Sequence, residues 1–151
     1  MQLYEATLPM YKGTLKITGT SQCVTSIEYV DAYLQEQDGF KEVYKAKQQL
    51  YQYINKTRTT FDVCLDYKRT PFINAVYEAL MKVQAKEVIS YKQLAINAGY
   101  PKAARAVGMA MATNKHLIMI PCHRVIASDH SLGGFTGGLE LKQFLLNHEQ
   151  N

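Results

Sequence analysis

The residue pattern changes near residues 67–71, and this change constrains the fold more than any other feature of the 151-residue chain. Before it, residues 13–19 and 24–30 gather β-branched and aromatic residues between turn residues, as hairpin strands do. After it, apolar residues recur at three-to-four spacing, which is typical of helices. We therefore expect a strand-containing unit followed by a mostly helical one.

Two further elements are expected in the first unit. Residues 40–54 carry Val43, Ala46 and Leu50 at helical spacing, and residues 60–66 alternate like a strand. These elements predict an α+β unit of about 66 residues.

The second unit begins with a helix at Pro71, since Pro is favoured in the first turn. Its apolar positions run to Val83. Ser90 and Gln93 then form a capping-box pattern, which predicts a short helix over residues 91–97.

Gly99 and Pro101 end that short helix, and a second helix is expected over residues 102–113. Two short helices joined by a Gly-containing turn form a helix-turn-helix unit. The second helix is rich in Ala, which suits either tight helix packing or a close approach to a nucleic-acid backbone. Arg105 is its one long charged side chain, and the sequence leaves open whether it is solvated or enters a groove.

Cys122 and His123 are adjacent between two apolar runs within residues 117–126. A thiol needs a base to become a strong nucleophile, and imidazole is the usual one. Apolar flanks suggest a partly buried pocket. We interpret Cys122 as a functional nucleophile.

Three cysteines are an odd number, and they are widely spaced, which favours reduced thiols in a cytoplasmic protein over a disulfide framework. All four histidines lie in the second half, so Cys23 and Cys64 are expected to be core residues and no metal site is predicted. No apolar run approaches the roughly 20 residues of a membrane span, and the start lacks a signal-peptide pattern.

Basic residues dominate residues 88–128, which hold five of them and no Asp or Glu, in a chain of net charge +4. A stretch of this kind is the footprint expected for a phosphate backbone, or a solvated cationic face. Charge alone favours neither interpretation.

The second half resembles the O6-alkylguanine-DNA alkyltransferase family over residues 71–150. The matching motifs are SYKQLA at 90–95, ARAVG at 104–108, Asn114, IPCHRVI at 120–126, LGGF at 132–135, GGL at 137–139, Lys142, Leu145, Leu146 and Glu149. The first half matches more loosely, through KGTL at 12–15.

This resemblance implies an α+β protein with a small ribonuclease-H-like α/β domain over residues 1–66. A linker over residues 67–70 would lead to a mostly helical domain over residues 71–151 with a winged helix-turn-helix. That domain would bind double-stranded DNA through the minor groove, as a monomer and without a cofactor.

The resemblance further implies that Cys122 takes the alkyl group of O6-alkylguanine, with O4-alkylthymine as a second lesion, from a flipped-out base. His123 would receive the thiol proton through a water, and Glu149 would orient the imidazole. The carbon–sulfur bond of the resulting thioether is hard to break, because the cysteine sulfur is a poor leaving group. Each protein molecule would therefore react once. The other implied catalytic residues are Tyr91, Lys142 and Asn114.

The implied DNA-binding residues are Arg105, Tyr91, Lys92, Lys102, Ala104 and Arg124, and the implied pocket residues are Met111, Phe135, Thr136 and Gly137. Phe135 stands where many members have Tyr, and Lys115 follows Asn114 in place of the common Pro. Gly137 and Gly138 suggest tolerance of alkyl groups larger than methyl. The alternative is a non-enzymatic lesion-binding relative, but such proteins replace the cysteine that is present here.

Overall fold

The computed structural model describes residues 1–135 and 137–151, and its α+β chain divides into two compact units. Unit 1 comprises Met1–Tyr67 and Lys115–Leu117, and unit 2 comprises Lys68–Asn114 and Ile118–Asn151. The chain thus returns to unit 1 for three residues between α4 and the reactive-cysteine segment. No helix among the described residues has the length and apolar character needed to cross a membrane.

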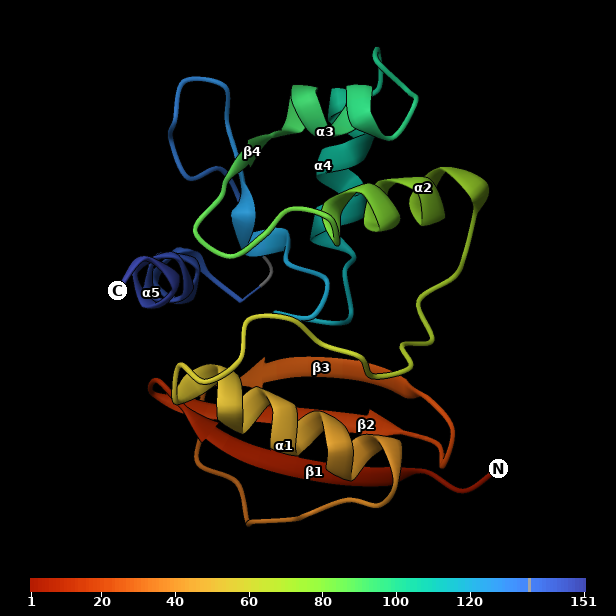
Figure 1. The fold of residues 1–151 in the computed structure, drawn as a ribbon, viewed down its shortest axis with the longest axis vertical. Coiled ribbons are helices and arrows are strands. Elements are labelled where there is room, and N and C mark those ends of the chain that lie inside the picture. The colour runs from red at the N-terminus through yellow and green to blue at the C-terminus, as the bar shows by residue number, and fades with distance from the viewer. Residues whose placement is uncertain (136) are drawn as a thin grey trace. The chain divides into compact units, whose positions relative to one another are not determined.

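Unit 1 is an antiparallel three-stranded sheet with a helix against one face (Figure 1). Its strands are β1 (Tyr4–Met10), β2 (Gly13–Gly19) and β3 (Val24–Val30), and its helix is α1 (Glu42–Ile54). The strands predicted over residues 13–19 and 24–30 are confirmed, as is the helix. β1 was missed because Pro9 weakens its strand signal, and an edge strand tolerates a proline.

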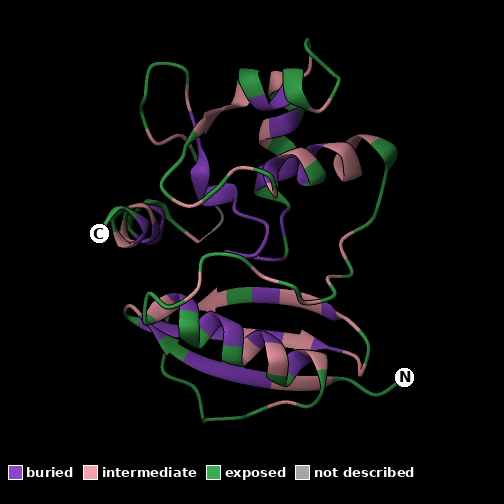
Figure 2. Ribbon diagram, viewed as in Figure 1, coloured by how far each residue is buried: buried purple, intermediate pink, exposed green. Residues whose placement is uncertain are grey.

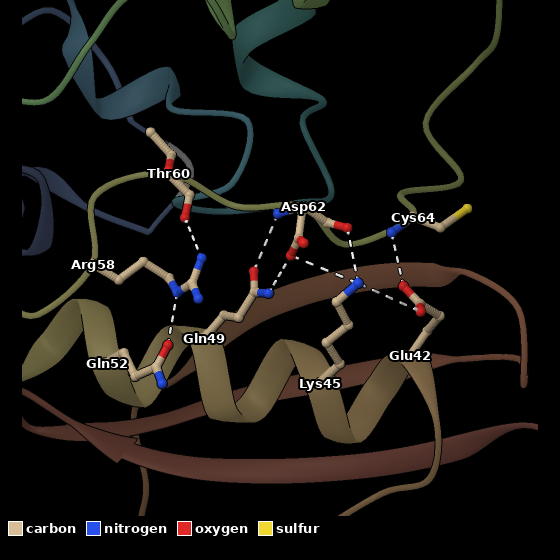
Figure 3. A network of polar contacts seen from close by, with 8 residues as sticks. All are labelled: Glu42, Lys45, Gln49, Gln52, Arg58, Thr60, Asp62 and Cys64. Atoms are coloured by element: carbon tan, nitrogen blue, oxygen red, sulfur yellow. Dashed lines mark hydrogen bonds and ion pairs between the residues drawn. The ribbon is translucent and has the colours of Figure 1, made fainter.

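The strand predicted over residues 60–66 is wrong. Only Leu65 pairs, in an isolated parallel bridge with Val24. Val24 exchanges backbone hydrogen bonds with Cys64 and Asp66 around this bridge. The middle of the segment is held by side chains of α1, since Gln49 and Lys45 contact Asp62 (Figure 3). The polar groups of residues 60–66 therefore bind mainly to α1, and a run of strand pairing with β3 does not form.

Cys23 and Cys64 are joined by a disulfide, with their Cα atoms 4.7 Å apart. The prediction of two reduced core thiols is therefore wrong, and Cys64 is exposed rather than buried. The pairing of Val24 with Leu65 brings these neighbouring residues together. Because they lie 41 residues apart in the sequence, their spacing carried no sign of the contact.

Unit 2 opens with α2 (Pro71–Leu80), α3 (Tyr91–Asn97) and α4 (Ala104–Ala112). The Thr70 hydroxyl accepts a hydrogen bond from the Ile73 amide and caps α2, which ends at Leu80, before the expected Val83. The bounds predicted for the second short helix were slightly too wide, because residues 101–103 form a turn.

Ser90 caps α3 as predicted, accepting the Gln93 amide proton at 3.0 Å. The Gln93 side chain donates to Asn97 at 2.9 Å, so it is directed along the helix and not back to the Ser90 amide as in a full capping box. The helix bounds at residues 91–97 are confirmed.

The remaining elements of unit 2 surround the predicted nucleophile. They are β4 (Ile89–Ser90), the 3₁₀ turn η1 (Cys122–Arg124), β5 (Val125–Ile126) and α5 (Leu139–Gln150). β4 and β5 pair in parallel, Ile89 with Val125, which fixes the start of α3 beside the segment that follows η1. Residues 118–126 are all buried (Figure 2), so the predicted buried setting of Cys122 is confirmed.

Candidate active site

Cys122 lies at the start of η1, and Asn114 at the end of α4 holds it there. The Asn114 amide nitrogen Nδ2 donates to the Ile120 carbonyl at 2.9 Å and to Cys122 Sγ at 3.1 Å. Ile118, four residues before Cys122, adopts a positive φ of 72°, which is uncommon for a β-branched residue. Such conformations persist only where the surroundings enforce them, and residues 118–122 are buried.

Burial raises the pKa of the Cys122 thiol to about 11, although the hydrogen bond from Asn114 and the charge of Lys142 favour the thiolate. The side chain is 3% exposed. At neutral pH the resting cysteine is therefore a protonated thiol, which needs a base when it reacts.

Glu149 on α5 contacts both residues that follow Cys122. His123 Nε2 lies 2.7 Å from Glu149 Oε2, and Arg124 donates through Nε to Oε1 and through Nη2 to Oε2, each at 2.9 Å. Burial opposes ionisation of Glu149, but these hydrogen bonds and the positive charge of Arg124 outweigh it and lower the pKa of Glu149 to about 2. Glu149 is therefore a carboxylate at neutral pH.

The contact with Glu149 assigns the proton of the neutral imidazole. A carboxylate only accepts hydrogen bonds, so Nε2 of His123 carries the proton and Nδ1 carries a lone pair. Nδ1 is buried and has no hydrogen-bond partner among the described residues. Burial lowers the pKa of His123, despite the hydrogen bond to Glu149, so the ring is neutral and its Nδ1 can accept a proton.

Lys142 on α5 is fully buried, and its ammonium donates to three backbone carbonyls. Nζ lies 2.6 Å from the Val125 oxygen and 3.2 Å from that of Gly134, and it also contacts the Leu132 oxygen. Burial lowers the pKa of Lys142 to about 8. These bonds tie β5 to the loop that forms one wall of the pocket.

A cavity of about 330 Å³ opens beside Cys122. Its wall combines two rings, Tyr91 and Phe135, with residues of little or flexible bulk: Gly108, Met111, Ala112 and Gly134. Burial raises the pKa of Tyr91, so its phenol remains a proton donor. Gly133 allows this arrangement, because a Cβ there would lie 2.7 Å from the Tyr91 hydroxyl.

The structure brings Cys122, His123, Glu149, Asn114 and Lys142 into one connected set, and it places Tyr91, Met111 and Phe135 around the cavity. Gly137 is not among the described residues that line the cavity. A Cβ at Gly137 would lie 2.6 Å from Leu141, so this glycine serves packing rather than room for a ligand. Thr136 lies outside the described residues.

Arg124 was assigned to DNA binding, and the structure contradicts that assignment. Its side chain is buried, paired with Glu149, and donates through Nη1 to the Val83 carbonyl at 2.7 Å. A guanidinium held in this way cannot reach a phosphate. Arg105, Lys92 and Lys102 are exposed, and Ala104 is half-buried.

Sequence reasoning missed the pocket roles of Gly108, Ala112 and Gly134, and the contact of Asn114 with the thiol. A signal for two of them existed, because positions 108, 111 and 112 share one face of a helix. Met111 was already among the predicted pocket residues. No local pattern pointed to Gly134.

Comparisons with known proteins show the family of this chain. Residues 71–151 match the family model described as 6-O-methylguanine DNA methyltransferase, DNA binding domain. The chain is 39% identical over 125 residues to the methylated-DNA–protein-cysteine methyltransferase of Methanosarcina barkeri, covering 83% of this chain and 77% of that protein.

Two solved structures from Mycobacterium tuberculosis share the fold. An O6-methylguanine methyltransferase superposes with a TM-score of 0.85 and 32% identity, covering 99% of this chain and 93% of that one. The protein called OGT in complex with DNA gives a TM-score of 0.84 and 33% identity, covering 97% and 92%. The matched domain spans more than half of the chain and contains every residue of the site described above. This chain belongs to the 6-O-methylguanine DNA methyltransferase family.

Proposed function

We propose that this protein repairs alkylated DNA directly, by moving the alkyl group from guanine O6 to the sulfur of Cys122. The observation that carries the proposal is the buried set in which Asn114 holds the thiol and Glu149 holds His123, beside an open cavity. The Methanosarcina barkeri relative is named for methyl transfer to a protein cysteine, and one similar structure is a complex with DNA.

The thiol must lose its proton as it reacts, and His123 is the base for this step. Its Nδ1 carries the lone pair, and we propose that it receives the proton through one bridging water. The imidazolium that forms is stabilised by the Glu149 carboxylate at Nε2. Arg124 keeps that carboxylate ionised and fixed in place.

Transfer then forms a bond from Cys122 Sγ to the alkyl carbon while the bond from that carbon to guanine O6 breaks. The electron pair leaves with guanine, and the Tyr91 phenol donates a proton toward the leaving ring. Lys142 supplies a positive charge that favours the thiolate and holds residues 132–134 at the pocket. The product is a thioether, so each molecule acts once.

The lesion must leave the base stack to reach a buried sulfur. The cavity is lined by the rings of Tyr91 and Phe135, on which a planar base would stack, and by Gly108 and Gly134, which add no side-chain bulk. Exposed Arg105 on α4 would fill the gap that the base leaves in the duplex. Met111, whose side chain is flexible, would adapt the floor of the cavity to the alkyl group.

α3, the turn with Gly99, and α4 form the proposed helix-turn-helix, which would lie in the minor groove. Exposed Lys92 and Lys102 would contact phosphates, and the small side chain of Ala104 would allow a close backbone approach. β4, β5 and the loop after β5 would form the wing. Unit 1 would have the ribonuclease-H-like fold, with the functional domains at residues 1–66 and 71–151.

We further propose that the protein acts as a monomer in the cytoplasm and also accepts O4-alkylthymine. Gly134 would leave room for alkyl groups larger than methyl, since a Cβ there would meet nothing within 4 Å. Transfer of a benzyl group from free benzylguanine tests whether the pocket accepts such groups. Good methyl transfer without benzyl transfer would exclude it.

Intact mass measurement tests the central proposal. The protein is incubated with a duplex that contains O6-methylguanine, and a gain of one methyl group, mapped to the Cys122 peptide, is expected. Cys122→Ala should show no gain, and Cys64→Ala, the exposed-cysteine control, should gain the methyl group like the wild type. An unmodified wild-type protein that still binds the lesion duplex would favour the non-enzymatic alternative.

A further inference from the structure

The disulfide of unit 1 has no part in the chemistry at Cys122. It joins half-buried Cys23, just before β3, to exposed Cys64 in the segment that follows α1. The Cα separation of 4.7 Å lies within the range that disulfides require. The bond thus joins two backbone segments that already lie at bonding distance.

Noncovalent contacts hold these two segments together independently of the sulfur atoms. The Val24 amide donates to the Cys64 carbonyl, and the Asp66 amide donates to the Val24 carbonyl, both at 2.8 Å. Glu42 Oε2 accepts the Cys64 amide proton at 2.9 Å. Figure 3 shows the contacts that continue this network: Lys45 and Gln49 of α1 bind Asp62. Arg58 donates to Gln52 of α1 and to the Thr60 carbonyl. The backbone would therefore keep the two cysteines adjacent after reduction.

Access differs sharply between the disulfide and the reactive cysteine. Figure 3 shows the Cys64 sulfur directed away from Glu42 and the polar network, on an exposed residue. Cys122 is only 3% exposed and is held as a protonated thiol. Thiol–disulfide exchange requires a thiolate and an open line of attack. An external thiol can therefore reach Cys64 while Cys122 stays out of the exchange.

We propose that Cys23 and Cys64 form a reversible dithiol–disulfide site whose co-reactant is an external thiol–disulfide couple of the glutathione class. A thiolate attacks Cys64 Sγ, and the electron pair of the broken bond leaves on Cys23 Sγ, which takes up a proton. A second thiolate attacks the mixed disulfide and releases Cys64 as a thiol. Two external thiols are oxidised to one disulfide, and the protein disulfide is reduced to two thiols.

Formation of the Cys23–Cys64 disulfide should restrain β3 and residues 115–117 as well as the segment that carries Cys64. The Val24 carbonyl that receives Asp66 also lies 2.9 Å from His116 Nε2. Ile27 on the same strand exchanges hydrogen bonds with Lys115 and Leu117, at 2.7 and 3.0 Å. β3 thus anchors residues 115–117, directly before the run to Cys122. Closing a loop across 41 residues should raise the melting temperature on the order of 10 °C.

A redox titration of the full chain tests the proposal. The protein is equilibrated in glutathione buffers from oxidising to reducing, quenched in acid, denatured, and labelled with a maleimide for intact mass and peptide mapping. The expected count of free thiols moves from one, at Cys122, to all three, and returns on reoxidation. Three labels at every ratio, one label at every ratio, or a stable glutathione adduct on Cys64 would each overturn the proposal.

Thermal melting supplies a second readout. Oxidised wild type should melt above reduced wild type, whereas Cys64→Ser should melt at one temperature in both buffers and retain methyl transfer. Cys122→Ser should keep the full redox dependence. Equal melting temperatures for oxidised and reduced wild type would also contradict the proposal. The redox titration and the melting curves use no DNA, so their outcomes are independent of the proposed repair activity.

Discussion

Glu149→Gln should show how much the folding stability of the protein depends on one buried carboxylate in unit 2. The carboxylate pairs with Arg124 through two hydrogen bonds and with His123 through a third. The amide keeps the shape but loses the charge, so Arg124 is left buried without its counter-ion. The amide NH₂ can also donate to His123 Nε2, which would move the imidazole proton to Nδ1 and disable the base.

The magnitude follows from the pKa of Glu149. Burial alone would raise this pKa, but the hydrogen bonds from His123 and Arg124 and the charge of Arg124 lower it to about 2 from 4.5. At about 1.4 kcal/mol per pH unit, this corresponds to about 3 kcal/mol of folding free energy at pH 7. Because the folded-state pKa is lowered, this stabilisation is complete well above pH 4.5 and is lost as the pH falls toward 2. By pH 3, about 2 kcal/mol of it should be gone.

Urea unfolding of wild type and Glu149→Gln at pH 7 and pH 3 measures this directly. At pH 7 the free energy of unfolding of the wild type should exceed that of Glu149→Gln by about 3 kcal/mol or more. At pH 3 this difference should be smaller by about 2 kcal/mol. Glu140→Gln, exposed on the same helix, should change neither value. A gap that is independent of pH would refute the assignment of an ionised, paired Glu149. The single-turnover rate should fall on the order of 10²–10⁴-fold.

Three further substitutions test other parts of the site. Asn114→Ala removes a hydrogen bond that lowers the pKa of Cys122, so that pKa should rise further and alkylation of the thiol at pH 7 should slow roughly tenfold per pH unit of the rise. Arg105→Ala should slow repair of methylated duplex about tenfold or more, as measured in single-turnover assays, while transfer from free benzylguanine is unchanged. Gly133→Ala combines a φ of +68° with a Cβ placed 2.7 Å from the Tyr91 hydroxyl, so it should displace that ring, reduce repair and cost about 1–2 kcal/mol in urea unfolding.

Each of these variants has a matched control. Asn97→Ala removes an exposed helix-end amide without touching Cys122, and Lys82→Ala removes an exposed cation outside the proposed DNA face. Gly99→Ala has comparable backbone strain, at φ +91°, but its Cβ meets nothing within 4 Å. If Asn114→Ala left thiol reactivity unchanged, the amide would not support the thiolate. Equal reductions in the rate of duplex repair for Arg105→Ala and Lys82→Ala would indicate a general charge effect. Normal repair by Gly133→Ala would remove Tyr91 from the reaction.

Local signals predicted the elements that local interactions build. The Ser90 cap and the turn residues Gly99 and Pro101 placed α3 at its observed bounds, because these residues act on backbone groups within a few positions. The α1 helix likewise follows from the spacing of its apolar residues. β1 escaped detection, since a strand is completed by a partner and Pro9 masks its pattern.

The site could be predicted only in part. Cys122 and His123 are neighbours in sequence, so their chemistry is visible there, but Glu149 at the chain end reads as an exposed charge without the family resemblance. Arg124 is also only partly predictable, because the sequence motif contains it but does not show whether its side chain faces DNA or Glu149. Burial decided that question, because a guanidinium enclosed with a carboxylate must pair with it.

By itself, the sequence determined the helical second half, the reactive cysteine and the family to which both belong. Only the tertiary structure decided which nitrogen of His123 is free, that Arg124 is a buried partner of Glu149, and that Cys23 is bonded to Cys64. The physical reason is range. Periodicity and capping act over a few residues, whereas these three contacts depend on long-range packing that brings distant segments of the chain together.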